Sequence, residues 1–90
     1  MHAVIISVSV DPGHLEAARK ALREQVVPRV KGASGFVKGI WTGKDDSGVS
    51  MTLFKTQQDA EAGAAMARSG PPPPGVTVRS VEVREVIVEA

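Results

Sequence analysis

Cysteine, tyrosine and asparagine are absent from the sequence, and its aromatic residues are one tryptophan and two phenylalanines. Without cysteine the chain has no disulfides, no thiolate metal sites and no cysteine nucleophile. Aromatic residues make up 3% of the chain and hydrophobic residues 42%, so the core must consist of Val, Ile, Leu, Met and Ala. These side chains bury less area than aromatic rings, which predicts a small stability margin for a domain of 90 residues.

A strong excess of one charge is also missing. Eleven basic and ten acidic residues give a formal net charge of +1, so bulk charge predicts neither a nucleic-acid partner nor an anionic membrane surface. No apolar run reaches the ~20 residues of a membrane span. The short apolar run Ala3–Val10 lacks the basic leader of a signal peptide and is typical of a strand. We therefore expect one cytoplasmic domain over residues 1–90.

The hydrophobic pattern predicts four strands and two helices. β-Branched residues with a period of two place strands at residues 2–10, 36–43, 49–55 and 76–88. Asp11 and Pro12 begin the first helix, which has one apolar stripe and is expected to bend or end at Val27, before Pro28. The stripe consists of Leu15, Ala18, Leu22 and Val26.

The second helix begins at Thr56, which forms a variant capping box with Asp59, and it ends at Ser69–Gly70. Its face of small residues predicts a close approach to the sheet; this face consists of Ala60, Gly63, Ala64 and Ala67. In the last strand, apolar triplets recur every five residues. Either that strand is buried on both faces or bulges at Arg79–Ser80 and Arg84–Glu85 reset its phase. The order βαββαβ predicts an α+β, ferredoxin-like fold with a four-stranded antiparallel sheet and both helices on one face.

Two registers of the central hairpin compete. We prefer Gly43 opposite Gly48, and a slip of one residue would instead place Trp41 with Met51. In the preferred register, the helices cover an aliphatic face with Val4, Ile6, Val8, Val10, Ile40, Met51, Leu53 and, as a defect, Lys38. The outward face then carries Ile5, Ser7, Ser9, Val37, Gly39, Trp41, Ser50, Thr52 and Phe54. Because both faces carry large apolar groups, we expect a homodimer formed through the sheet faces.

Four stretches together resemble a known family: "DPGH", "GFVKGIW", "VSMTLFKTQQDAEAGA" and "SVEVREVIVEA". Nearly the whole chain is similar to the small dimeric α/β-barrel proteins of the antibiotic biosynthesis monooxygenase type. The resemblance implies ferredoxin-like subunits that pair through their sheets, each with a cavity between sheet and helices. It further implies oxidation of aromatic phenols, quinols or heme, in some members without metal or flavin, so no cofactor is expected.

Trp41 is the main candidate for ligand binding, because its ring can stack on a flat aromatic molecule beside Gly39 and Gly43. The alternative is that this ring fills the core or a dimer interface. Further candidate ligand-binding residues are Phe54, Ser7, Ser9 and Arg84.

Other polar residues have simpler interpretations. His14 is expected to be an exposed residue at the start of a helix, and His2 to order a strand end. Asp45–Asp46 are typical turn formers, and "PPPP" is typical of a plain loop. No acidic or histidine residues have metal-ligand spacing, so no metal is expected.

Two functions are compatible with the sequence, which does not decide whether the chain is an enzyme. The first is a small homodimeric protein that binds a hydrophobic or aromatic molecule in a cavity. The alternative is a cofactor-independent monooxygenase acting on an aromatic or quinol substrate, with the substrate anion itself reacting with oxygen.

Overall fold

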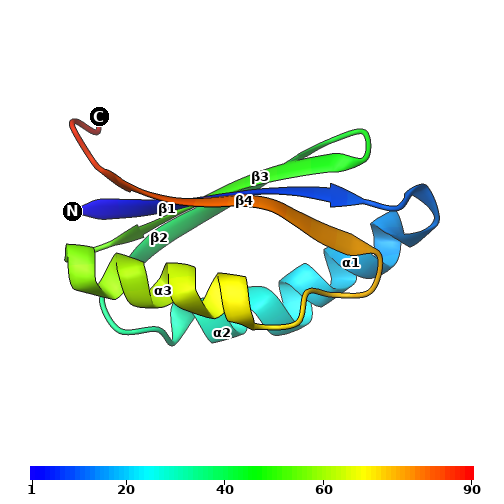
Figure 1. Cartoon of the computed structure of the whole chain (residues 1–90), viewed down its shortest axis with the longest axis horizontal. Coiled ribbons are helices and arrows are strands. Elements are labelled where there is room, and N and C mark those ends of the chain that lie inside the picture. The colour runs from blue at the N-terminus through cyan, green and yellow to red at the C-terminus, as the bar shows by residue number, and fades with distance from the viewer.

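The computed structural model describes all residues, 1–90, and has the expected α+β, ferredoxin-like architecture. Its single antiparallel sheet has the order β2-β3-β1-β4, with all helices on one face (Figure 1). The strands are β1 (His2–Val10), β2 (Phe36–Lys44), β3 (Ser47–Phe54) and β4 (Val76–Glu85). After β4 the chain turns away on the side of the sheet opposite the helices (Figure 1). We call the covered side of the sheet the helix face and the uncovered side the open face.

The first helical region runs past the proline at which it was expected to bend or end. It comprises the 3-10 turn η1 (Pro12–His14), α1 (Leu15–Ala21), the π-helical segment η2 (Leu22–Val26) and α2 (Val27–Lys31). A proline inside a helix lacks an N–H donor, and its ring clashes with the carbonyl four residues earlier. The π-helical turns lie directly before Pro28, where a wider helix relieves that clash. Asp11 lies at the expected N-cap position, but its side chain makes no capping hydrogen bond.

The second helical region, α3 (Gln57–Ser69), packs closely on the sheet, as its small residues predict. The Oγ1 of Thr56 accepts a hydrogen bond of 3.0 Å from the backbone N–H of Asp59, which confirms this half of the capping box. Ala60 and Ala64 are fully buried and form the core cluster with Val4 and Phe54. A Cβ added to Gly63 would lie only 2.9 Å from Cζ of Phe54, so the missing side chain of Gly63 is what lets the ring sit against the helix.

The hairpin has the preferred register, with Gly43 opposite Gly48 and Trp41 opposite Ser50. The assignment of its two sets of residues to the sheet faces was wrong, however. β1 pairs Ile6 with Ser50 and Ile5 with Met51. Directly opposed residues project to the same face. Trp41, Ser50, Thr52 and Phe54 therefore share the helix face with Val4, Ile6, Val8 and Val10, while Ile40, Met51 and Leu53 share the open face with Ile5, Ser7 and Ser9.

This reversal removes the defect of the preferred register, because Lys38 lies opposite Leu53 on the open face and is exposed. The hairpin also contains a bulge. Phe36 pairs with Phe54 and Lys38 with Leu53, which leaves Val37 as an extra residue. The Phe36 and Phe54 rings meet edge to face, with their centroids 6.1 Å apart.

One of the two bulges expected in the last strand is present. Ser7 pairs with Ser80 and Val8 with Val78, so Arg79 is the extra residue and the phase of β4 is reset there. All four valines of β4 that pair with β1 therefore project to the helix face; they are Val76, Val78, Val81 and Val83. At Arg84–Glu85 the strand ends and does not bulge, and the tail residues Ile87 and Val88 are more than 80% exposed.

Candidate ligand cavity

A cavity of about 630 Å³ lies between the helix face of the sheet and the first helical region. The apolar stripe of that region forms its roof, with Leu15, Ala18, Leu22 and Val26. Valines and an isoleucine of β1 and β4 form much of its floor: Ile6, Val8, Val10, Val76 and Val78. Met66 and Ala67 of α3, with the loop residues Pro71–Pro73, close one side. The stripe that predicted an amphipathic helix thus faces a cavity and not a close-packed core.

Trp41 lies on the cavity wall, on the edge strand β2. A Cβ built on Gly39 would lie 2.6 Å from Cη2 and 2.7 Å from Cζ3 of the indole, so the ring extends back along the strand over Gly39. Gly39 therefore makes room for the indole itself. Trp41 is half-buried and is among the residues that line the cavity.

Beside Trp41, two glycines of the cavity lining carry no side chain. Gly43 and Gly48 face each other across the β2–β3 pair. A Cβ on Gly43 would meet no atom closer than 3.8 Å, whereas a Cβ on Gly48 would come within 3.2 Å of Cγ2 of Val8. A methyl group at Gly43 would thus fit in ordinary contact with Nη2 of Arg19 and the backbone oxygen of Ser47, whereas one at Gly48 would crowd Val8.

Ser50 is the buried polar residue of the wall. It is 8% exposed and lies in one cross-strand row with Trp41 and Ile6. Its hydroxyl takes part in none of the side-chain hydrogen bonds of the molecule. A ligand polar group above this row would find a hydroxyl without a protein partner.

The charged residues on the cavity wall are all arginines: Arg19, Arg23 and Arg29, from the first helical region. None of the ten acidic residues lines the cavity. The one salt bridge of the molecule joins Arg84 to Glu82 at 3.0 Å, on the open face. The positive charge at the cavity is therefore not balanced by an ion pair within the chain.

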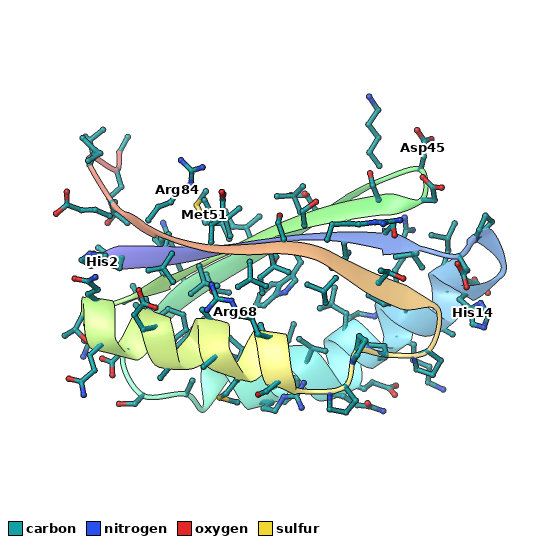
Figure 2. The ribbon with its side chains drawn as sticks, in the orientation of Figure 1. His2, His14, Asp45, Met51, Arg68 and Arg84 are labelled. Carbon is teal, nitrogen blue, oxygen red and sulfur yellow. The ribbon has the colours of Figure 1, made fainter.

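Of the five ligand-binding residues predicted from the sequence, the structure brings only Trp41 to this cavity. Ser7, Ser9 and Arg84 lie on the open face, and Figure 2 shows Arg84 and Met51 on the side of the sheet away from the helices. The Oγ of Ser9 accepts a hydrogen bond of 3.0 Å from Nε of Arg79. Phe54 is on the helix face but is 2% exposed within the core cluster.

Neither histidine lines the cavity. His14 is exposed, as expected, and lies at the η1 end of the molecule (Figure 2). A Cβ on Gly75, whose φ is +80°, would lie 2.5 Å from Cβ of His14, so this histidine also packs on the loop before β4. His2, at the start of β1, has a buried Nδ1 without a hydrogen-bond partner. Asp45 occupies the hairpin turn with a φ of 54°, as a turn former should.

The sequence interpretation missed Ser50 and the three arginines. Ser50 was placed on the wrong face with Trp41, and its burial depends on the β1–β3 pairing. The arginines did leave a signal. Arg19 follows Ala18 and Arg23 follows Leu22, so both flank the apolar stripe on the same side of the helix.

No protein-family profile matches the sequence, and no curated protein matches it. The fold, in contrast, resembles many solved structures. The heme-degrader MhuD from Mycobacterium tuberculosis, with two hemes bound in its active site, matches with a TM-score of 0.74 and 17% identity over 100% of this chain and 99% of that one. A putative antibiotic biosynthesis monooxygenase from Chloroflexus aurantiacus matches with a TM-score of 0.66 and 11% identity over 99% of this chain and 95% of that one.

A dimeric ferredoxin-like protein from an uncultured marine organism matches with a TM-score of 0.65 and 10% identity over 100% of this chain and 98% of that one. The resemblance inferred from the sequence is thus confirmed at the level of the fold, across the whole length of the chain. In none of the helices is there an apolar stretch of the length that crossing a membrane requires.

Proposed function

We propose that this chain is a homodimeric binding protein for a small hydrophobic or aromatic molecule, held in the cavity between the sheet and the first helical region. The observation that carries the proposal is the cavity itself. At about 630 Å³ it falls within the range of roughly 300–1,000 Å³ of small-molecule sites, and aliphatic side chains line most of it. Trp41 adds an aromatic surface and Ser50 a hydroxyl that can fix the orientation of a ligand.

The second subunit is proposed to cover the open face. Large apolar side chains remain exposed there, with Ile40 at 58%, Val49 at 48% and Met51 at 44%. An apolar patch of this kind on one side of a sheet is typical of an interface. A two-fold axis would place the same patch of two copies against each other, and a structure with this fold is itself described as dimeric.

The heme of the neighbour MhuD is not carried over to this chain. The cavity wall contains no histidine, and the chain has no cysteine or tyrosine. The thioether of Met66 is on the wall, but methionine binds heme iron beside a histidine, and no imidazole, thiolate or phenolate is placed there. An organic molecule without a metal fits the aliphatic wall better.

Cofactor-independent monooxygenation is the second candidate function, and the fold shared with a putative antibiotic biosynthesis monooxygenase favours it. An anthrone-type substrate would lose the two hydrogens of its CH₂ group and gain one atom of O₂ as a carbonyl. The other oxygen atom would leave with those hydrogens as water, so the substrate supplies all the electrons. The protein would supply a dry, oriented pocket with Trp41 against the rings.

Binding can be tested with the neutral aromatic probe N-phenyl-1-naphthylamine. We expect saturable quenching of the single tryptophan, and an affinity about tenfold lower in Trp41→Ala when probe fluorescence is followed. The control Lys55→Gln changes an exposed loop residue outside the cavity and should bind like the wild type. Absence of saturable binding, or equal affinity in Trp41→Ala, would contradict the site.

The dimer and the chemistry need separate measurements. Sedimentation at micromolar concentration should give a species of twice 9.4 kDa, and Met51→Lys should shift it to the monomer; a wild-type monomer would refute the interface. Consumption of one O₂ per anthrone- or quinol-type molecule, lost in Trp41→Ala, would support the monooxygenase. If no substrate of such a panel causes oxygen uptake, the monooxygenase function is refuted and only the binding function remains.

A further inference from the structure

We infer that the ligand carries an acidic group, and that the arginines at the cavity, Arg19 foremost, recognise it. This inference rests on the proposed binding function and specifies its ligand class as an apolar, partly aromatic carboxylate. The first observation is one of charge. Three of the six arginines line the cavity, and no lysine and no acidic residue does.

Arg19 reaches across the space between helix and sheet. Its Nη2 lies 3.8 Å from the position that a Cβ on Gly43 would occupy, although Arg19 belongs to α1 and Gly43 to the edge strand β2. The Arg19 guanidinium therefore lies in the cavity lining next to Gly43. An acid group entering above Gly43 would meet it directly.

The second observation is the absence of ion-pair partners. No carboxylate lies within 4.0 Å of a guanidinium nitrogen of Arg19, Arg23 or Arg29, whereas Arg84 on the open face has Glu82 at 3.0 Å. A guanidinium presents a planar fork of donors that matches a carboxylate in a bidentate arrangement. Because the three arginines are exposed, an ion pair with a ligand would require little desolvation of the protein.

A simpler explanation is that these arginines form only the solvated side of an amphipathic helix, with their stems over apolar surface. The distribution of charge around the helix argues against it. The outward side of the same region is mixed, with Glu16, Lys20 and Glu24, and none of these three lines the cavity. If solvation alone determined the charges of this helix, acidic and basic side chains would be mixed on both sides, since water solvates both kinds well.

The inference can be tested with 1-pyrenebutyrate and its methyl ester, which share the aromatic group and differ in the carboxylate. We expect the wild type to bind the acid about three- to fivefold more tightly than the ester, as for an ion pair with an exposed guanidinium. Arg19→Gln should abolish this preference and leave the affinity for the ester within about twofold. Arg19→Lys should keep part of it, because the charge remains and the bidentate fork is lost.

Arg79→Gln is the matched control, because it removes the same charge from a residue outside the cavity. It should bind both probes like the wild type. Equal affinity for acid and ester in the wild type would overturn the inference and leave the binding function standing. An equal loss in Arg79→Gln and Arg19→Gln would also overturn it, since the effect would then be one of net charge. Failure of both probes to bind would refute the binding function as well.

Discussion

The two helical regions cover the same face of one sheet in different ways. α3 lies directly against β1, β3 and β4, while the first helical region touches the sheet mainly where α2 meets β2. Under α3, the fully buried Ala60 and Ala64 pack with Val4 and Phe54. Under α1 and η2, no residue of the helix is buried, and the space is a cavity of about 630 Å³.

Side-chain size explains this difference. Alanine and glycine let the axis of α3 approach the strands, so that a phenylalanine of β3 fills the remaining space. Leucines, valines and arginines hold the first helical region further away, and the glycines opposite it do not fill the gap. Close packing is thus confined to one half of the helix layer, and a cavity lies under the other half.

The largest effect should come from truncating one large side chain in each half. Phe54→Ala should lower the free energy of unfolding by about 3–5 kcal/mol, because a fully buried ring is lost from a close-packed site. Leu22→Ala should lower it by only about 1 kcal/mol, because Leu22 is half-buried and already faces a cavity. Urea denaturation followed by circular dichroism measures both values.

These denaturation measurements need one fixed protein concentration, because dimerisation adds to the apparent stability. Equal losses in the two variants would mean that the first helical region is packed as tightly as α3. If Phe54→Ala does not fold, the smaller truncation Phe54→Leu keeps the comparison with Leu22→Ala measurable.

A smaller effect is expected from adding one methyl group in each half. Gly63→Ala should destabilise the protein by about 1 kcal/mol, because the new Cβ would lie 2.9 Å from the Phe54 ring and this overpacking exceeds the gain in helix propensity. Gly43→Ala should change stability by less than about 0.5 kcal/mol, since its nearest neighbours are 3.8 Å away. It should instead weaken binding of N-phenyl-1-naphthylamine, because the methyl group narrows the cavity floor.

A stabilised Gly63→Ala protein would show that α3 can move away from Phe54 without loss. Unchanged probe affinity in Gly43→Ala would place the ligand elsewhere in the cavity. Both variants add one methyl group, so Gly63→Ala reports on the packing of α3 and Gly43→Ala on ligand binding.

Most of the fold could be predicted from the sequence because local signals determine it. Three such signals can be recognised from residues that are close together in the sequence. They are the Thr56 cap, the small residues of α3 and the glycine pair of the hairpin. The path of the chain through Pro28 could not be predicted in the same way. A proline normally ends a helix, and the π-helical segment that accommodates it has no sequence signal of its own.

The candidate site was predicted less well, because it depends on which strand lies beside which residue. Sorting the hairpin by hydrophobicity placed Ile40 and Met51 under the helices. In the structure the register with β1 instead places the buried Ser50 and Thr52 there. Trp41 was identified because it is the only tryptophan. The resemblance implied a cavity between sheet and helices, but the predicted faces placed Trp41 on the other side of the sheet. The height of a helix above a sheet follows from all the side chains between them.

The smallest expected difference concerns the starts of the two helical regions. Thr56→Ala should lower the free energy of unfolding by about 1 kcal/mol, because it removes the acceptor for the N–H of Asp59. Asp11→Ala should lower it by only a few tenths of a kcal/mol, since the Asp11 side chain makes no capping hydrogen bond and acts only on the helix dipole. Thr56→Ser, which keeps the hydroxyl, should retain most of the stability. If Asp11→Ala costs as much as Thr56→Ala, the first helical region must contribute to folding as strongly as α3, and the division between a stabilising half and a binding half would fail.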